Sequence, residues 1–242
     1  MMNELSIIIP CVYSTDRLPR LIDELSTYLM ANPTDVDLIV VANEQVVNAE
    51  EVLGYVRGKY PWIKFTMLRL SGGLRSYGAL VRFGLAYSTS QYAALLSVHG
   101  DDDISLIPKM LAEMRKGSQV VQAVRYADAD CRKGIPLRFK LYQHIYRALT
   151  RLFLGLNISD STYGFKMFDR IFLQALGLSQ NGFSISPEIT FKALLAKGKV
   201  TYLVSSCKNV PLSKDFKLYR EGVGYLWLLY RGFLHCLGIR WF

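Results

Sequence analysis

The sequence has 242 residues, 51% of them hydrophobic, and its 29 Lys and Arg outnumber its 20 Asp and Glu, which gives a formal net charge of +9. This length suits one α/β domain with a full core, and the basic excess favours anionic partners: phosphates, nucleic acid or an anionic membrane surface. The sequence contains no zinc finger, RNA-recognition motif or long Lys/Arg run, and its four cysteines form no C-x-x-C pair, which excludes the common nucleic-acid-binding, zinc-site and redox motifs.

Five short apolar runs, rich in Ile and Val, predict strands. They are residues 5–9, 36–41, 63–68, 92–98 and 120–124. The first run, LSIIIP, is too short for the apolar core of a secretory signal. Helical patterns lie between the first four runs, at residues 18–30, 49–59 and 75–87, and a later helix is predicted to begin at Pro187 and to stop near Gly198. This alternation indicates an α/β fold whose mostly parallel sheet carries helices on both faces.

Three adjacent carboxylates, Asp101, Asp102 and Asp103, follow the fourth predicted strand. Sheets of this kind bind ligands beyond the carboxyl ends of their strands. Adjacent carboxylates repel one another unless a cation neutralises them, and a divalent ion with oxygen ligands, Mg or Mn, does this while bridging to a diphosphate. The triplet therefore predicts a metal site. The alternative is that Asp103 only caps the helix that follows.

Two later segments have the composition of membrane-surface helices. Residues 131–159 contain no Asp or Glu, and their Arg and Lys interleave with Leu, Ile and Phe. Residues 220–242 are apolar and aromatic but are interrupted by Arg231, His235 and Arg240, whereas a spanning helix needs ~20 mainly apolar residues. Both patterns favour helices lying in a membrane interface. The alternatives are a solvated basic helix face for the first segment, and a terminal helix packed on the core or on a dimer partner for the second.

Seven segments occur in the order in which one enzyme family carries them. They are LSIIIP, GGLRSYGALVRFGLAYSTSQY, GDDDISLIPKMLAEMRKG, VVQAVRY, ISDSTYGFKMFDR, GFSISPEITFKALLAKGKV and NVPLS. Together they resemble the family 2 glycosyltransferases, most closely the branch of dolichol- or polyprenyl-phosphate mannose synthases. The resemblance implies the nucleotide-sugar-binding GT-A fold, which is Rossmann-like, in residues 1–210. It leaves a basic loop and a membrane-associating or packing helix in residues 211–242.

On the donor side, the family pattern falls on the ends of the predicted strands. The resemblance implies that the nucleotide sugar contacts Pro10, Val12, Asn43, Glu44, Gly73, Arg75, Asp101 and Asp102. Two positions depart from the family. Its P-x-Y-N-E after the first strand reads PCVYS here, and its Asp-Asp pair after the second strand is replaced by Asn43 and Glu44. Both side chains still accept hydrogen bonds from ribose hydroxyls or a base N–H.

The D-x-D motif of the family, which implies a divalent metal cofactor, fits this sequence in two registers. An alignment without gaps places Ser97 and His99 at the two carboxylates and Asp101 at a further metal-contacting position. A shift of two residues places Asp101 and Asp103 on the motif instead. The metal candidates are therefore Asp101, Asp103 and His99. The alternatives for His99 are a group that supports a ligand and an ordinary strand-end residue.

The acceptor side is expected to contain Arg125, which matches a family arginine that meets phosphate. Asp160 and Glu188 match acidic residues of the family and are the remaining catalytic candidates. Either is a general base or a group that orients Arg or Lys. An attacking sugar hydroxyl needs such a base, whereas a polyprenyl phosphate is already anionic. The basic loop of the family matches Lys214, Lys217 and Arg220 only loosely.

The sequence thus predicts a peripheral enzyme on the cytoplasmic face of a membrane. It would move a sugar from a nucleoside-diphosphate sugar to a polyprenyl (dolichyl or undecaprenyl) phosphate, with inversion and a divalent metal. One alternative is transfer to a hydroxyl of a cell-surface polysaccharide or lipid-linked glycan, with Asp160 or Glu188 as base. The other is a non-catalytic nucleotide-sugar-binding or scaffold subunit. No nucleic-acid partner is expected, and a homo-oligomer remains open.

Overall fold

The computed structural model describes residues 3–13, 15–31, 35–44, 46, 48–71, 76–125, 135–205, 218–240 and 242. Its strands are β1 (Leu5–Cys11), β2 (Val36–Asn43), β3 (Lys64–Leu70), β4 (Tyr92–Leu95), β5 (Val120–Val124), β6 (Lys166–Asp169) and β7 (Val200–Val204). Its helices are α1 (Leu18–Ala31), α2 (Ala49–Lys59), α3 (Tyr77–Tyr87), the 3-10 helix η1 (Ile104–Leu106), α4 (Ile107–Arg115), α6 (Leu137–Leu154), α7 (Arg170–Ala175), α8 (Ile185–Leu195) and α9 (Leu218–Cys236).

The strands described form one mixed sheet in the order β3-β2-β1-β4-β6-β5-β7. Strands β1 to β4 run parallel, β5 runs parallel to β7, and β6 is antiparallel to both of its neighbours. The predicted α/β class with a mostly parallel sheet is therefore confirmed. All five predicted strands exist, although the fourth ends at Leu95 rather than at residue 98. Sequence reasoning missed β6 and β7.

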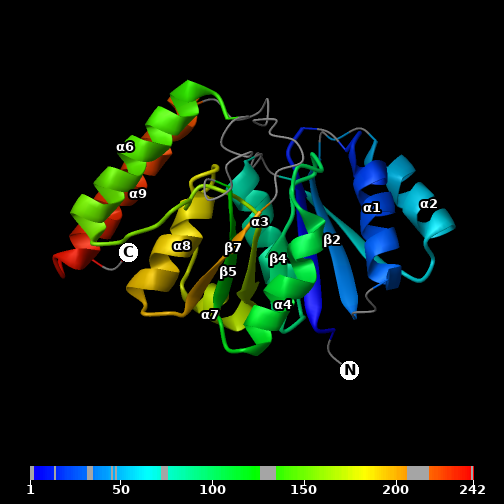
Figure 1. Ribbon diagram of the computed structural model, residues 1–242. Coiled ribbons are helices and arrows are strands. Elements are labelled where there is room, and N and C mark those ends of the chain that lie inside the picture. Colours follow the sequence, from blue (N-terminus) through cyan, green and yellow to red (C-terminus); the bar gives the residue numbers. More distant parts are fainter. Residues whose placement is uncertain are drawn as a thin grey trace.

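Helices cover both faces of the sheet, as Figure 1 shows. On one face, apolar side chains of α1, α2 and α4 pack on the sheet in a single core cluster. On the other, α3, α7 and α8 pack in a second cluster. Strands β1, β2, β4 and β5 are fully buried along their length because both of their faces are covered. Their continuous apolar sequences follow from this.

Helices α6 and α9 lie side by side at the edge of the molecule, beyond α8 (Figure 1). A third apolar cluster joins them to α8 through Tyr146, Phe191, Tyr225 and Leu228. The helices approach closely at Gly232 of α9, where a Cβ atom would lie only 2.8 Å from a methyl carbon of Leu154. Within the described residues, no helix is long and apolar enough to span a membrane.

The later predicted helices are present with shifted ends. Helix α8 begins at Ile185, two residues before Pro187, and ends at Leu195. The C-terminal helix α9 begins at Leu218 and ends at Cys236. The predicted helix at residues 75–87 begins at Tyr77. Several predictions lie outside the described residues: those for Gly73, Arg75, Lys214, Lys217, the side chain of Arg220 and the segment NVPLS.

Candidate active site

The acidic triplet lies at the carboxyl end of β4, after a tight turn. Gly100 has a φ of 71°, a left-handed conformation that glycine adopts without strain, and its N–H donates to the carbonyl of Ser97 at 3.3 Å. The Asp102 carboxylate folds back over this turn and accepts a hydrogen bond from the backbone N–H of Ser97 at 2.6 Å. The turn thus ends the strand early and fixes the direction of the triplet.

Asp103 has the capping role that the sequence left open. Its Oδ1 accepts hydrogen bonds from the backbone N–H of Ser105 at 3.3 Å and from the Ser105 hydroxyl at 2.5 Å. It is the N-cap residue of η1, which leads directly into α4. This use of the carboxylate competes with metal binding by Asp103, so the geometry favours Asp101 as the main ligand.

Asp101 has the property expected of a cation ligand. Its Oδ1 is buried and has no hydrogen-bond partner. Burial, and next the charge of Asp101, raise the pKa of neighbouring Asp102 to about 7. A divalent cation would satisfy the first atom and favour the ionised form of the second group. The residues at this position therefore fit a metal.

A complete ligand set is not preformed in the part of the chain that the structure describes: no group of three or more His, Cys, Asp or Glu side chains is arranged to hold a metal. His99 contributes backbone contacts to the turn, since its N–H donates to Ser97 Oγ at 3.2 Å and its carbonyl accepts from Arg17 at 3.3 Å. Magnesium commonly takes one or two carboxylates and completes its shell with water and substrate phosphates. This geometry is compatible with that mode of binding.

Two tyrosines that sequence reasoning missed border the carboxylates. Tyr77, at the start of α3, stacks on Phe183 with ring centroids 4.7 Å apart. Burial raises the pKa of Tyr77, and the charges of Asp102 and Asp101 raise it further. The hydroxyl of Tyr77 lies 3.1 Å from where a Cβ of Gly164 would be, so glycine provides the room for it. Tyr77 follows the Gly-rich stretch, but its sequence position carries no signal of this contact.

The second tyrosine, Tyr163, joins the acidic triplet to the acceptor-side residues. Burial raises its pKa well above the usual value, and the Asp102 carboxylate, to which it hydrogen-bonds, raises it further. The guanidinium of Arg125 lies over its ring, 4.4 Å from the centroid. Tyr163 thus brings Asp102 and Arg125, predicted from separate motifs, into one site.

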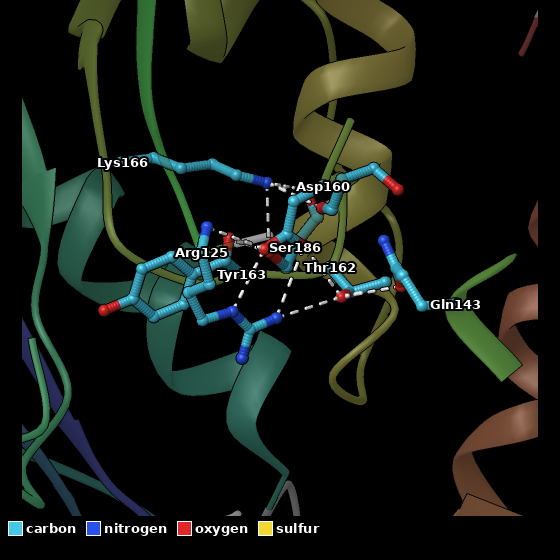
Figure 2. A network of polar contacts seen from close by, with 8 residues as sticks. Arg125, Gln143, Asp160, Thr162, Tyr163, Lys166 and Ser186 are labelled. Carbon is cyan, nitrogen blue, oxygen red and sulfur yellow. Dashed lines mark hydrogen bonds and ion pairs between the residues drawn. The ribbon is translucent and has the colours of Figure 1, made fainter. Parts of the chain in front are cut away.

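Arg125 and Asp160 form a two-point ion pair, drawn in Figure 2. Nε of Arg125 lies 3.0 Å from Oδ2 of Asp160, and Nη2 lies 3.3 Å from Oδ1. Thr162 adds a hydrogen bond to Oδ1 at 3.1 Å. Burial would raise the pKa of Asp160, but the charge and hydrogen bonds of Arg125 outweigh it and lower the pKa below the usual range. A fully buried, ion-paired carboxylate of low pKa suits the orienting role rather than that of a general base.

Glu188 is buried in α8 and holds the loop before it. Its carboxylate accepts from the N–H groups of Ser179 and Gln180 at 2.9 Å and from the Ser179 hydroxyl at 2.8 Å. Lys192, one helical turn later, pairs with it at 3.1 Å. Every side of this carboxylate is therefore used by the fold, and the contacts favour a structural role.

The predicted donor positions gather at the same edge of the sheet. Pro10 is buried near the end of β1 and pairs in register with Val41 of β2, and Val12 follows β1 and packs on the second core cluster. Asn43 ends β2 and is buried, whereas Glu44 after it is exposed. Because β1 lies between β2 and β4, these positions flank the acidic triplet on the side of the carboxyl ends.

Comparison with known proteins finds one matching family model and several similar folds. The model of one protein family, glycosyl transferase family 2, matches residues 6–177. The mannosyl-3-phosphoglycerate synthase from Rubrobacter xylanophilus is similar with a TM-score of 0.65 and 15% identity, over 97% of this chain and 74% of that protein.

Two further structures were solved with nucleotide sugars. The mannosyltransferase PcManGT from Pyrobaculum calidifontis, in complex with GDP-Man and Mn²⁺, is similar with a TM-score of 0.61 and 13% identity, over 95% of this chain and 64% of that one. TarS 1-349 from S. aureus, in complex with UDP-GlcNAc, has a TM-score of 0.61 and 14% identity, over 96% of this chain and 66% of that one. At such identities these likenesses show the GT-A-like fold alone.

Proposed function

The chain belongs to glycosyl transferase family 2, the nucleotide-sugar-using glycosyltransferases, and we propose that it transfers a sugar to a polyprenyl phosphate at a membrane surface. In the proposed reaction, a phosphate oxygen of the lipid attacks the anomeric carbon. The bond from that carbon to the diphosphate oxygen breaks in line, so the configuration inverts and the nucleoside diphosphate leaves.

The donor is proposed to lie at the edge formed by β1, β2 and β4, with Asp101 as the main metal ligand. The unpartnered, buried Oδ1 of Asp101 supports this choice. A bound Mg²⁺ or Mn²⁺ would supply charge stabilisation for the departing diphosphate. Asp102 is proposed to orient the site, because it ties the turn at Ser97 to Tyr163.

The observation that carries the choice of acceptor is the Arg125–Asp160 pair. Asp160 fixes the guanidinium at two points, and Tyr163 supports it from one face. A held guanidinium suits recognition of a phosphate. Transfer to a hydroxyl would instead need a base, but Asp160 and Glu188, the two predicted bases, are both engaged by the fold. A phosphate acceptor needs no base, so the geometry favours it.

The outer face of α6 and α9 supports a membrane-bound acceptor. Large apolar side chains there are exposed: Leu137, Leu141, Ile145 and Leu152 of α6, and Val223, Leu226, Trp227 and Tyr230 of α9. Basic residues of α6, among them Arg138 and Arg151, accompany them. This combination suits the interface of an anionic membrane. We propose that this face rests on the cytoplasmic leaflet.

A transfer assay tests the proposed reaction. The protein is incubated with Mn²⁺, undecaprenyl phosphate in detergent and a panel of UDP- and GDP-sugars labelled in the sugar. The expected result is label in an organic-extractable, acid-labile lipid, lost in Asp101→Ala. Undecaprenol, the same lipid with a hydroxyl in place of the phosphate, is the matched control acceptor. Equal transfer to undecaprenol, or no transfer to the phosphate from any donor, would contradict the proposal.

Vesicle sedimentation tests the membrane surface. Leu141→Glu and Ile145→Glu are expected to release the protein from vesicles that contain anionic lipid. Met30→Glu, which changes an even more exposed apolar side chain on α1, is expected to leave binding unchanged. Binding that survives both α6 changes would show that this face does not meet the membrane.

A further inference from the structure

Lys166, the first residue of β6, has a side chain that is 0% exposed. Its ammonium contacts the carbonyl of Ser161 at 3.0 Å, the hydroxyl of Ser186 at 3.0 Å and the hydroxyl of Thr190 at 2.9 Å. It also donates to the carbonyl of Ser186. One buried cation therefore joins β6, the loop that begins with Asp160, and α8.

The hydrogen-bond partners of the Lys166 nitrogen favour its protonated form. The Ser186 hydroxyl donates its own hydrogen to the carbonyl of Tyr163 at 2.8 Å, and the Thr190 hydroxyl donates to Oε1 of Gln122 at 2.7 Å. Both hydroxyls are thus acceptors toward Lys166. Four acceptors face the nitrogen, and an ammonium has three N–H groups to share among them, one more than a neutral amine has. Its contacts are those of a bound cation rather than of a simple buried amine.

The electrostatic surroundings contain one compensating charge. Burial lowers the pKa of Lys166 to about 7, the nearby Asp160 carboxylate opposes this shift, and Arg125 adds to it. The Asp160 carboxylate, which holds Arg125, is the charge that favours the protonated form of Lys166.

The contacts of Lys166 converge on residues 160–163, the segment that holds the guanidinium of Arg125. Lys166 fixes Ser161 directly, and it fixes Tyr163 through the Ser186 hydroxyl. Thr162 lies between these two anchored residues and donates a hydrogen bond to Asp160. Asp160, just before Ser161, pairs with the guanidinium of Arg125, and the ring of Tyr163 lies against it. Figure 2 shows Lys166 on one side of this segment and Arg125 on the other.

The same network reaches the strand that bears the arginine. Thr190 links Lys166 to Gln122, which lies on β5 three residues before Arg125. Both the strand that carries Arg125 and the loop that holds it are therefore tied to one ammonium. A displacement of ~1 Å in such a site can cost about a hundredfold in rate.

We propose that Lys166 is a positioning residue for Arg125: its buried ammonium fixes the segment from Asp160 to Tyr163 against α8, so that Asp160 and Tyr163 aim the guanidinium at the acceptor phosphate. This inference rests on the proposed role of Arg125. Lys166 itself is enclosed by protein, so it is proposed to act through its neighbours and not by contact with the phosphate.

The first test needs no substrate. The Nε–H resonance of Arg125 is observed by arginine side-chain NMR at pH 6.0, where Lys166 carries its proton, and is assigned by its loss in Arg125→Lys. We expect this resonance to be sharp in the wild type, and shifted or broadened in Lys166→Met. Lys192→Met is the matched control, because Lys192 is a second buried lysine but pairs with Glu188 and with the carbonyl of Gly177. The Arg125 resonance is expected to be unchanged in this control.

The second test is a double-mutant cycle on the rate of sugar transfer. Lys166→Met is expected to lower kcat/KM for the lipid phosphate at least tenfold in the wild type and by less than twofold in Arg125→Ala. Ser186→Ala keeps the lysine but removes the link to Tyr163, and it is expected to give a smaller loss of kcat/KM that also depends on Arg125. This variant replaces Lys166→Met in the cycle if Lys166→Met does not fold.

The outcomes separate the inference from the proposed function. An unchanged Arg125 resonance in both Lys166→Met and Ser186→Ala, or a loss of rate that is equally large without Arg125, would overturn the positioning role. If the wild type transfers nothing to the lipid phosphate but the Arg125 resonance responds as expected, the positioning role of Lys166 is supported and the proposed acceptor is wrong.

Discussion

Asp160 holds Arg125 at both ends of its carboxylate, with Nε–Oδ2 at 3.0 Å and Nη2–Oδ1 at 3.3 Å, while Asp160 itself is 0% exposed. The pair joins two segments whose sequences predicted different roles, a phosphate-binding arginine and a candidate base. In the proposed function, the carboxylate orients the guanidinium and the guanidinium binds the acceptor phosphate.

Asp160→Asn tests this division of roles. The amide keeps the shape but removes the charge that holds the guanidinium, so we expect kcat/KM for the lipid phosphate to fall about tenfold or more with nucleotide affinity unchanged. Because the pKa of Asp160 is lowered by Arg125, the pair stabilises the fold above the unfolded value near 3.8 and loses that contribution as pH falls through the folded pKa. Acid unfolding followed by circular dichroism should show this contribution in the wild type and not in the variant.

The two registers of the acidic motif make different predictions for Asp101 and Asp103. If Asp101 is the main ligand, Asp101→Ala abolishes Mn²⁺-dependent binding of UDP or GDP in calorimetry. Asp103→Ala instead removes the N-cap of η1, which should cost ~1 kcal/mol of stability while leaving nucleotide affinity within a few-fold of the wild type. Equal losses of affinity in both variants would favour the register that uses Asp103.

The lowered pKa of buried Lys166 predicts that the stability of the fold depends on pH. Its folded pKa, about 7, lies below the ordinary value of 10.5, so between these values the unfolded chain binds more protons than the folded one. The free energy of unfolding should therefore rise with pH from 7 toward 10. Asp160 faces Lys166 but stays ionised throughout this window, as does Arg125. Urea unfolding at several pH values should show a smaller rise in Lys166→Met, and an identical rise would contradict the assignment.

The backbone packing around Gly78, at the start of α3, leaves no room for a side chain. A Cβ there would lie 2.4 Å from the carbonyl oxygen of Gln180 and 2.7 Å from that of Asn181. Gly78→Ala should therefore displace the loop before α8 and destabilise the fold by ~1–3 kcal/mol. Gly58→Ala is the matched control, because a Cβ at that helical position meets nothing within 4 Å. It should stabilise α2 by up to ~1 kcal/mol in the same thermal unfolding measurement.

The sequence predicted those parts of the molecule whose signal is local. The strands β1, β2, β4 and β5 are buried and mostly apolar runs, and the acidic triplet follows one of them, so these features were visible in the sequence. Strand β6 was missed because it has four residues, begins with the buried Lys166 and pairs antiparallel between β4 and β5. Nothing near Lys166 in the chain indicates the partners that make a buried charge acceptable there.

Residue roles within the site depended on contacts between distant segments. Tyr77 and Tyr163 are 86 positions apart, and only the fold brings both beside Asp102. Asp160 and Glu188 looked alike in the sequence as acidic residues near helices. The structure separates them, because one carboxylate faces Arg125 and the other is enclosed by the Ser179–Gln180 backbone and Lys192.

Steady-state kinetics toward both substrates, compared between the wild type and Arg125→Lys, decide whether Arg125 binds the acceptor phosphate. We expect that loss of the two-point guanidinium raises KM for the polyprenyl phosphate at least tenfold, while KM for the nucleotide sugar changes less than threefold. If the KM for the nucleotide sugar rises instead and that for the lipid phosphate does not, Arg125 belongs to the donor side, and the proposed acceptor site is wrong.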